Sequence, residues 1–310
     1  MQAFFSVIIP LYNKEKHITQ TLESVLSQSF TNFEVIIVND GSTDMSLAEV
    51  EKIYDDRIKI FNKKNKGASA ARNFGIDVSK TDYIAFIDAD DLWHKEHLQI
   101  IYNLIADYPK AGMFSTGYLI SYNSNSKKSK IKGIPEGFKG IIPDFFESCL
   151  YDTPVNSSVV VIKKAVLKKL KGFDENIKSG QDIDLWIRIA LKNKVAIHNI
   201  ISATYVKNDA SLSNSLLAMD KIKYLNKFKD YEETNISLKK FMDMNRFSVA
   251  ILYKILNTIA LSNSIYASID KVNLNLKQRF IYNLPQVVLK FLYSLKKNLD
   301  KKGMFFHLYR

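Results

Sequence analysis

The chain has 310 residues, of which 46% are apolar and 25% charged, a composition typical of one large or two smaller folded domains. Its single cysteine, Cys149, excludes an internal disulfide and a cysteine-based metal cage and favours a reducing compartment. No window approaches the ~18 consecutive apolar residues of a membrane-spanning helix, and residues 1–10 lack a secretory signal, so we expect a cytoplasmic protein.

The net charge of +12 is concentrated near the carboxyl end. Residues 211–310 hold 17 Lys and Arg against 7 Asp and Glu, whereas residues 1–210 hold 27 against 25. A basic face of this kind attracts phosphate, in a nucleotide, a nucleic acid or an anionic lipid. We expect no nucleic-acid binding, because the basic residues lie on predicted helices without a recognised reading motif.

Strands and helices alternate through residues 1–90. Apolar runs predict strands at 4–9, 33–38, 58–61 and 83–87, and helical spacing or helix-start signals predict helices at 14–28, 44–54 and from 67 onward. Pro10 ends the first strand in this prediction. Short links between alternating elements are typical of a mostly parallel, doubly wound α/β sheet flanked by helices.

Three carboxylates, Asp88, Asp90 and Asp91, follow directly on the strand at 83–87. The carboxyl ends of parallel strands form the edge at which α/β sheets bind ligands. Clustered negative charges repel one another, and a divalent cation would offset that repulsion, so this turn predicts a metal site. The alternative is an acidic turn in which Asp91 caps a helix that begins near His94.

Beyond this turn the alternation continues and then changes near residue 215. We expect helices at 95–107, 145–150 and 163–171, strands at 113–122, 159–162 and 202–206, a loop or hairpin tip at 123–140, and a helix that opens after Gly180. Helices are also predicted at 220–230, 241–260 and 285–299. We therefore predict a domain at 1–215, with halves at 1–110 and 111–215, and a basic helical region at 216–310.

The last predicted helix has two distinct faces. One face holds Val287, Val288, Phe291, Leu292, Leu295 and Leu299, and Lys290, Lys296 and Lys297 lie away from it. One interpretation is a helix that packs on the rest of the protein and leaves a solvated basic face. The other is a basic amphipathic helix that rests on an anionic membrane.

Five segments at strand ends or helix starts resemble the motifs of family 2 glycosyltransferases. They are 6–15, 34–44, 67–73, the triplet Asp88–Ala89–Asp90, and 180–188. The resemblance covers about residues 4–213. It implies a GT-A fold with a carboxyl-terminal helical extension, a nucleotide-sugar donor, a divalent metal, and inversion at the anomeric carbon. It also implies that 1–110 is the nucleotide-binding half and 111–215 the acceptor-binding half of a catalytic domain.

In this family resemblance the donor site lies in the first half. Asp40 would accept the imide N–H of uracil, Tyr12 would stack on the base, and Arg72 would bind a uracil carbonyl or a phosphate. The same site would include Pro10, Asn13, Glu15, Gly67, Asp88 on the ribose, Ala89 and Asp90. The alternatives are an Asx turn of Asp40 with the following glycine and a helix N-terminal charge at Glu15.

Asp90, with Asp88 beside it, would hold Mn²⁺ or Mg²⁺, ions that suit hard oxygen ligands better than zinc does. Asp182 would be the catalytic base that takes the proton of the acceptor hydroxyl, unless it caps the helix that follows. Gln181 and Trp186 would lie on the acceptor side, although Trp186 would equally suit the core.

The chain departs from the family pattern at two places. Gln181 stands before the base, where Glu is common, and this removes a negative charge beside Asp182. Asn208, with Lys207 beside it, stands where many members carry a His that reaches the metal or the diphosphate. The metal therefore has fewer protein ligands in this prediction, or Lys207 supplies positive charge to the diphosphate.

We predict an inverting, metal-dependent hexosyltransferase that moves a sugar from a UDP-sugar to a hydroxyl of a glycan or polyprenyl-linked saccharide in surface polysaccharide synthesis. Its carboxyl-terminal helices would touch the inner face of the cell membrane. The alternative is a non-catalytic relative that binds a nucleotide sugar or scaffolds a glycan assembly complex, an option that Gln181 and Asn208 keep open. A sugar nucleotidyltransferase is disfavoured, because residues 10–13 lack a Gly-rich basic loop.

Overall fold

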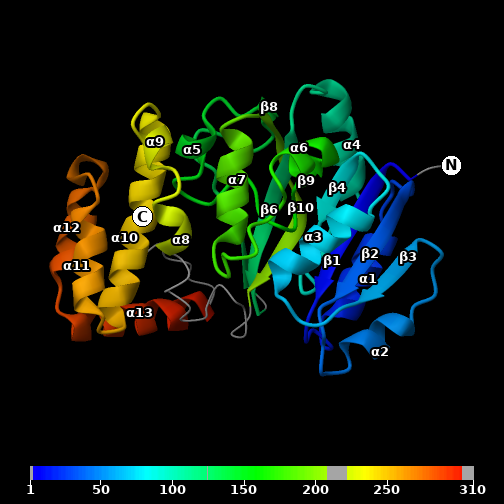
Figure 1. The fold of residues 1–310 in the computed structure, drawn as a ribbon, viewed down its shortest axis with the longest axis horizontal. Coiled ribbons are helices and arrows are strands. Elements are labelled where there is room, and N and C mark those ends of the chain that lie inside the picture. Colours follow the sequence, from blue (N-terminus) through cyan, green and yellow to red (C-terminus); the bar gives the residue numbers. More distant parts are fainter. Residues whose placement is uncertain (1–2, 124, 208–221, 302–310) are drawn as a thin grey trace.

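The computed structural model describes residues 3–123, 125–207 and 222–301. Its strands are β1 Phe5–Leu11, β2 Phe33–Asn39, β3 Ile58–Asn62, β4 Tyr83–Phe86, β5 Leu92–Trp93, β6 Met113–Tyr122, β7 Asn125–Lys128, β8 Lys139–Ile141, β9 Val161–Lys163 and β10 Val195–Lys207. They form one ten-stranded sheet in the order β3-β2-β1-β4-β9-β6-β10-β5, with β7 on β6 and β8 on β10 (Figure 1).

The amino-terminal part of the sheet is parallel. β1 pairs with β2 and β4, and β2 pairs with β3. The helices between these strands are α1 Ile18–Leu26, α2 Ser46–Glu51 and α3 Ala68–Val78. The prediction of alternating strands and helices is confirmed for this part. α1 begins later than predicted, because residues 15–17 form a turn before it, and the backbone N–H groups of Lys14 and Glu15 bind Ser46 and Asp44.

β1 continues through Pro10 to Leu11, so the prediction that Pro10 ends the strand is wrong. Proline lacks the N–H that a strand donates to its neighbour. β1 pairs with β4 only as far as Ile8, so Pro10 lies where one side of the strand has no partner to lose. The extension brings the end of β1 beside Asn39, the last residue of β2.

The second half of the sheet is mixed. β9 lies antiparallel to both β4 and β6, whereas β10 runs parallel to β6. β7 folds back on β6, which confirms a hairpin within 123–140. β10 is much longer than the predicted strand at 202–206, and its pairing shifts register between His198 and Ala203. The helices of this half are α4 His97–Asp107, α5 Phe145–Ser148, α6 Lys164–Lys169 and α7 Gln181–Ala190.

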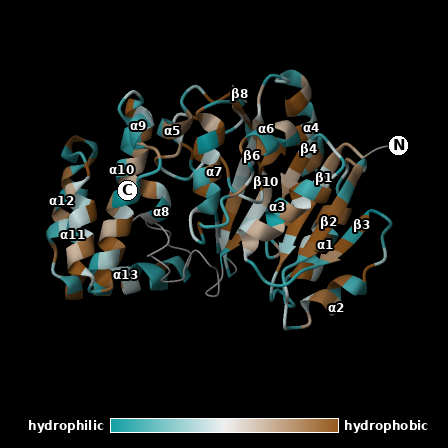
Figure 2. Cartoon of the chain, viewed as in Figure 1, coloured by the Kyte–Doolittle hydropathy of each residue, from teal (hydrophilic) through white to brown (hydrophobic). Residues whose placement is uncertain are grey.

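Hydrophobic side chains cover both faces of the sheet. Figure 2 shows hydrophobic residues along the strands β1, β2 and β4, and more hydrophilic residues on the helices and loops around the sheet. Alternate residues of β1 enter opposite clusters: Ile8 belongs to one, and Val7 and Ile9 belong to the other. α3 approaches β1 closely at Gly75, where an added Cβ would lie 2.6 Å from a methyl of Ile8. The base of the predicted donor site is therefore tightly packed.

The carboxyl-terminal helices are α8 Ile222–Leu225, α9 Lys229–Glu232, α10 Ile236–Ile255, α11 Ile259–Ala267, a 3₁₀ turn at Lys271–Asn273, α12 Leu276–Asn283 and α13 Gln286–Lys301. They lie beside α5 and α7 (Figure 1). Trp186 of α7, Phe247 of α10 and Leu289 of α13 belong to one continuous hydrophobic cluster. The predicted boundary near residue 215 lies outside the described residues. No described helix is long and apolar enough to cross a bilayer.

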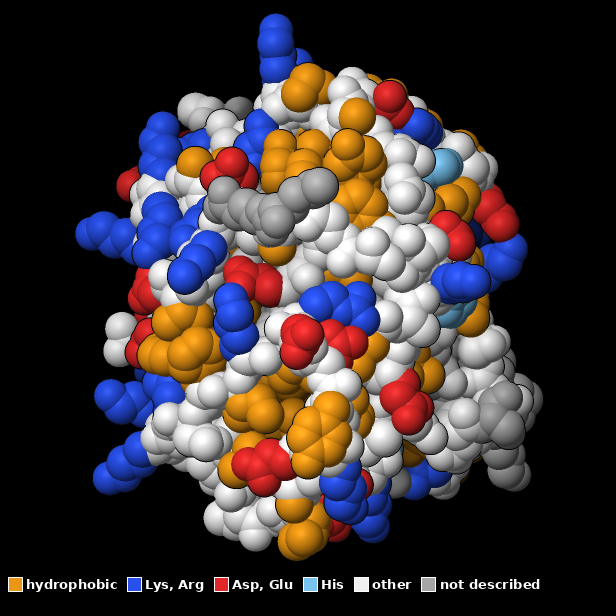
Figure 3. Space-filling view, turned by 90° about the vertical axis from the view of Figure 1, so that its right-hand side faces the viewer, with side chains coloured by type: hydrophobic (Ala, Val, Ile, Leu, Met, Phe, Trp, Pro, Cys, Tyr) orange, Lys and Arg blue, Asp and Glu red, His pale blue; other side chains and the backbone are white. Residues whose placement is uncertain are grey.

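Much of the predicted apolar face of α13 is open to solvent, although Leu292 and Leu299 are half-buried. Val287, Phe291 and Leu295 are 75%, 65% and 42% exposed, whereas Leu289 is buried. The opposite end of the molecule has a different surface. Figure 3 shows Lys and Arg there among acidic and apolar side chains, without a continuous basic area.

Candidate active site

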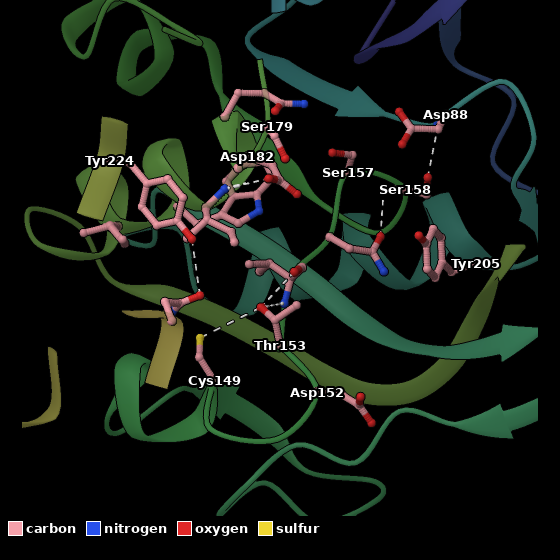
Figure 4. Close-up of a pocket in the computed structure, with 18 of the residues that line it drawn as sticks. Asp88, Cys149, Asp152, Thr153, Ser157, Ser158, Ser179, Asp182, Tyr205 and Tyr224 are labelled. Atoms are coloured by element: carbon pink, nitrogen blue, oxygen red, sulfur yellow. Dashed lines mark hydrogen bonds between the residues drawn. The ribbon is translucent and has the colours of Figure 1, made fainter. Parts of the chain in front are cut away.

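A cavity of about 700 Å³ opens beyond the carboxyl end of β4. Residues of the acidic turn, of 151–158, of α7, of β10, and of α10 and α13 line it. Among the predicted site residues it includes Arg72, Asp88, Asp90, Gln181, Asp182 and Trp186. Figure 4 shows Asp182 and Tyr224 toward one end, and Asp88 and Tyr205 toward the other. Pro10, Tyr12, Asn13, Glu15, Asp40, Gly67 and Ala89 do not line this cavity.

Two of these remaining residues join the loops that follow β1 and β2. The Asn13 side-chain oxygen accepts the backbone N–H of Thr43 at 2.8 Å, and a Glu15 carboxylate oxygen accepts that of Met45 at 3.0 Å. Tyr12 is 47% exposed beside them, so its ring is available for stacking on a planar group. Asn13 and Glu15 therefore shape the loop that presents Tyr12.

The carboxylate of Asp40 connects the end of β2 to the start of α3. It accepts the backbone N–H groups of Lys66, at 3.0 Å, and Gly67, at 2.7 Å. The side-chain oxygen of Asn39 accepts the N–H of Ser42 three residues on, whereas the hydrogen bonds of the Asp40 carboxylate go to Lys66 and Gly67. The alternative in which Asp40 forms an Asx turn with the following glycine is therefore wrong.

Arg72 lies on the buried face of α3, and its side chain reaches the acidic turn. One Nη atom lies 2.5 Å from Oδ1 of Asp88, and the guanidinium lies 5.3 Å from the ring centre of Phe173. Nε and the other Nη atom are buried and have no hydrogen-bond partner among the described residues. A guanidinium with unused buried donors in a cavity is suited to an anion or a carbonyl oxygen.

The three carboxylates of the acidic turn have separate partners. Asp88 pairs with Arg72, and Asp90 lies 2.5 Å from the ammonium of Lys14. Asp91 is buried, accepts a hydrogen bond from the Ser158 hydroxyl, and accepts the backbone N–H of Val206 at 2.7 Å. Burial, and then the charges of Asp88 and Asp90, raise the pKa of Asp91 well above its usual value.

The alternative in which Asp91 caps the next helix is wrong. α4 starts only at His97, with Glu96 at its N-cap position, and the short strand β5 comes between. Pairing with β10 draws Asp91 inward instead, where it fixes the end of that strand.

The described residues contain no cluster of three or more His, Cys, Asp or Glu side chains that could hold a metal by themselves. Two hard carboxylates of one turn, Asp88 and Asp90, nevertheless contact cationic groups, Arg72 of α3 and Lys14 of the loop after β1. Magnesium in proteins is commonly held by one or two carboxylates together with substrate phosphates. The residues present therefore fit an ion shared with a bound diphosphate, rather than an ion held by protein alone.

Asp182 lies in the first turn of α7, after Gly180 in the left-handed conformation. Its carboxylate accepts the N–H of Ile183 at 2.9 Å, and it is not the N-cap residue, so the capping alternative is wrong. Burial raises its pKa, and the opposing effects of the Ile183 N–H and the Arg72 charge do not cancel that rise. A carboxylate in this state is more basic than an ordinary aspartate.

Two neighbours of Asp182 have unused polar atoms. The side-chain oxygen of Gln181 and the indole N–H of Trp186 are buried without a hydrogen-bond partner among the described residues. The Gln181 oxygen accepts hydrogen bonds, and the Trp186 indole N–H donates one. Trp186 also packs against Phe173 and is only 4% exposed, so it belongs to both the core and the cavity wall.

The carboxyl-terminal helices build the remaining wall. Tyr224, which is buried, contacts Asn245 of α10 through its hydroxyl at 3.4 Å, and burial followed by the charge of Asp182 raises its pKa. The wall also includes Phe241, Ser248, Leu252 and Lys296. Sequence reasoning missed all of these residues and Ser158, because none of them belongs to a motif, and it gave no role to Lys14, although that residue lies within the motif at 6–15. Asn208 lies outside the described residues.

Comparisons with known proteins agree on one family. The model of the family described as glycosyl transferase family 2 matches residues 6–164. An uncharacterised glycosyltransferase of Rickettsia conorii is 34% identical over 273 residues, which cover 76% of this chain and 44% of the relative. The chain therefore spans less than half the length of that relative. Amylovoran biosynthesis glycosyltransferase AmsB of Erwinia amylovora is 37% identical over 194 residues, or 59% of this chain and 63% of its own.

Among solved structures, residues 1–349 of S. aureus TarS in complex with UDP-GlcNAc superpose with a TM-score of 0.58 at 22% identity. The match covers 86% of this chain and 91% of that one. A likeness at this identity shows the fold alone, and that fold is GT-A.

Proposed function

Because the chain belongs to glycosyltransferase family 2, we propose that it transfers a hexose from a UDP-sugar to a hydroxyl of a glycan or lipid-linked oligosaccharide, with inversion. The observation that carries this proposal is the placement of Asp182 in one cavity with Arg72, Asp88 and Asp90. A basic carboxylate and a phosphate-binding edge are the two parts that such a transfer requires.

The donor half of the proposal rests on the loops around β1 and β2. Tyr12 stacks on uracil, and Asp40 uses a remaining lone pair to accept the imide N–H. The unpartnered N–H groups of Arg72 bind a uracil carbonyl or a phosphate. Asp88 binds the ribose, and the same site includes Pro10, Asn13, Glu15, Gly67 and Ala89. UDP-GlcNAc in the TarS complex supports a UDP-sugar for a protein of this fold.

Asp90 and Asp88 would hold Mn²⁺ or Mg²⁺ together with the diphosphate. The ion, when bound, would neutralise charge that develops on the departing UDP. The ammonium of Lys14 lies 2.5 Å from Oδ2 of Asp90. Lys14 must therefore move away before this oxygen can bind a metal ion.

Asp182 acts as the base on the acceptor side. The acceptor oxygen forms a bond to the anomeric carbon while its proton passes to Asp182, and the carbon–oxygen bond to UDP breaks on the opposite face. One base and one displacement give inversion. The free side-chain oxygen of Gln181 and the indole N–H of Trp186 hydrogen-bond hydroxyl groups of the acceptor.

The AmsB relative acts in amylovoran biosynthesis, as its name states, and this supports a role in surface polysaccharide synthesis on the cytoplasmic side. The exposed side chains of Val287, Phe291 and Leu295 support peripheral contact with an anionic membrane through α13. Lys290 and Lys297 on the same helix are also exposed and would attract acidic headgroups.

Vesicle sedimentation tests the membrane contact. The double variant F291S/L295S should lose binding to vesicles that contain phosphatidylserine. Tyr54→Ser, at a 94% exposed tyrosine just after α2, a helix at the other end of the molecule from α13 (Figure 1), should bind as wild type does. Equal binding by the double variant and wild type would overturn the contact through α13.

A donor-hydrolysis screen tests the activity itself. Purified protein with Mn²⁺ or Mg²⁺ is offered UDP-glucose, UDP-galactose and their N-acetyl forms, and released UDP is measured. We expect metal-dependent release from one donor that Asp90→Ala abolishes and Asp182→Asn strongly reduces. Calorimetric titration with UDP and metal runs in parallel. Absence of both release and UDP binding would refute the nucleotide-sugar proposal, whereas UDP binding without turnover of any added acceptor would favour the non-catalytic alternative.

A further inference from the structure

Helix α13 presents a second, inward face to the cavity. Leu289 is buried in the core cluster, and Tyr293 packs against it from the next turn. Lys296 follows at helical spacing and lines the cavity itself. Its ammonium lies 2.6 Å from Asp300, and the two side chains are only 26% and 13% exposed. A lysine from the last described helix thus enters the site that the family motifs build.

Lys207 approaches the same region from the end of β10. The residue before it, Val206, donates its N–H to Asp91, which places Lys207 beside the acidic turn. Lys207 lines the cavity and is partly buried. Within 3–123, 125–207 and 222–301, no hydrogen bond or ion pair of its ammonium is found. Burial, followed by the charge of Lys296, lowers the pKa of Lys207.

Two ammonium groups that line the same cavity, those of Lys207 and Lys296, repel each other unless an anion lies between them. The carboxylates near Lys207 already have cationic partners: Asp300 binds Lys296, and Asp152 lies 3.5 Å from Lys127. The cavity has room for more than these side chains, with a volume of about 700 Å³. With Lys296 paired to Asp300, Lys207 is the ammonium of this group that lacks a carboxylate partner among the described residues, and an incoming anion would compensate its charge.

We propose that Lys296 of α13 and Lys207 of β10 together bind the diphosphate of the sugar nucleotide. This inference rests on the proposed function, and it adds a phosphate-binding residue from a helix that lies beyond the matched family region at 6–164. Lys296 exchanges Asp300 for a phosphate oxygen when the donor binds. Lys207, which has no carboxylate partner within the part of the chain that the structure describes, is available to the diphosphate.

Calorimetric titration of the full chain with UDP and with uridine, each in the presence of Mn²⁺, tests this proposal. Lys296→Met should weaken UDP binding by about fivefold, the factor that corresponds to one charge contact near a protein surface. Uridine, which has no phosphate, should bind the variant as it binds wild type. Lys296→Arg should restore most of the UDP affinity, and Lys290→Met, an exposed lysine of the same helix, should leave it unchanged.

Asp300→Asn provides an independent arm with the opposite sign. It removes the carboxylate that competes for Lys296 and should strengthen UDP binding, with little effect on uridine. Equal weakening of UDP and uridine binding by Lys296→Met would show that the lysine only supports packing, and this result would overturn the proposal. An unchanged UDP affinity with a raised KM for a phosphate-bearing acceptor would also overturn it. Failure of wild type to bind UDP would refute the proposed function as well.

Discussion

The ammonium of Lys14 neutralises Asp90 in the protein without ligands. The two side chains are 23% and 12% exposed, so the ion pair is largely shielded from water. Lys14 lies at the end of the loop after β1, the loop that also carries Tyr12. A divalent cation at Asp90 must displace this lysine. The free energy of the Lys14–Asp90 ion pair therefore opposes metal binding and weakens it.

Replacing Lys14 with methionine should therefore raise the affinity for Mn²⁺ in the absence of donor. We expect an increase of about fivefold, which corresponds to one shielded ion pair of roughly 1 kcal/mol. Electron paramagnetic resonance of free Mn²⁺ measures this directly. Lys16→Met, at an exposed lysine of the same loop, serves as the matched control. A lower Mn²⁺ affinity in Lys14→Met would instead mean that Lys14 holds Asp90 in its metal-binding position.

The raised pKa of Asp182 makes its carboxylate a stronger base and also lowers the stability of the folded protein at neutral pH. Because its pKa in the folded protein exceeds the value of 3.8 for a free side chain, folding favours its protonated form. The stabilisation from this group is complete below pH 3.8 and is lost as the pH rises through the raised pKa. At neutral pH the ionised carboxylate is therefore a net burden on the fold, and it is also the form that accepts a proton.

Asp182→Asn should remove turnover while raising the melting temperature at pH 7 by about 1–3 °C, a shift expected for roughly 1 kcal/mol in a protein of this size. Differential scanning fluorimetry and the UDP-release assay measure the two effects. For wild type, kcat should fall with decreasing pH along a limb whose midpoint lies above 3.8. A destabilised Asp182→Asn protein would indicate that the Asp182 carboxylate is needed for folding.

At the scale of elements, the junction between Gly180 and α8 controls the position of α7. Gly180 has a φ of +83°, and an added Cβ would lie 2.5 Å from a ring carbon of Tyr224. The contact joins the start of α7, which carries Asp182, to the wall formed by the carboxyl-terminal helices. A side chain at 180 would have to move either Tyr224 or the first turn of α7.

Gly180→Ala should lower kcat by about tenfold or more, since small displacements of catalytic groups are costly. Gly137→Ala is the matched control, because its φ is +80° and an added Cβ there meets no atom within 4 Å. Both variants have the left-handed strain of about 1–2 kcal/mol, so the difference between them measures the contact with Tyr224. Similar kcat values for the two variants would show that Tyr224 adjusts without moving Asp182.

Most elements of the first half could be predicted, because each strand there is an unbroken apolar run that ends in turn residues. β10 was predicted only in part, since Asn199 interrupts its pattern. The Asn199 amide binds the carbonyl groups of Ile134 and Pro135 and gives the strand an irregular register. α11 and α12 were missed, since no helix was predicted over 261–284, where packing contacts such as the stacked rings of Tyr266 and Tyr282 hold the two helices together.

The residues of the candidate site also fall into those that the sequence predicted and those that it did not. Asp88 and Asp90 were predicted because they follow a strand end, a position that binds ligands in α/β proteins, whereas the roles expected of Arg72 and Asp182 came from the resemblance to family motifs. Tyr224 and Lys296 reach the cavity only through the packing of helices far along the chain. No local pattern distinguishes them from core or surface residues, so the structure was required to find them.

At the scale of the whole molecule, a buried ion network holds the carboxyl-terminal helices together. Arg246 of α10 binds Glu232 of α9 at 2.5 Å, Asp243 at 2.9 Å, and the carbonyl of Leu225 in α8 at 2.7 Å. All three charged side chains are almost fully buried. The network lies next to Tyr224, so it also supports the cavity wall.

Arg246→Met should lower the unfolding free energy by about 3 kcal/mol, because the buried carboxylates of Glu232 and Asp243 lose their buried guanidinium partner and keep only the more exposed Lys239. The loss should appear as a shift of one cooperative calorimetric transition, since the helices share a hydrophobic cluster with the sheet. Lys277→Met, at an exposed lysine of α12, should leave the transition unchanged. Two separate transitions in wild type would contradict a common core.

Leu295 and Lys296 are neighbours on α13, yet one side chain faces solvent and the other lines the cavity. A membrane surface that binds the outer face of α13 would thereby fix the orientation of the inner face, which carries Lys296. Turnover should then depend on the area of lipid available per enzyme rather than on the bulk concentration of donor alone. The protein would behave as an interfacial enzyme, efficient where its acceptor is anchored and slow elsewhere.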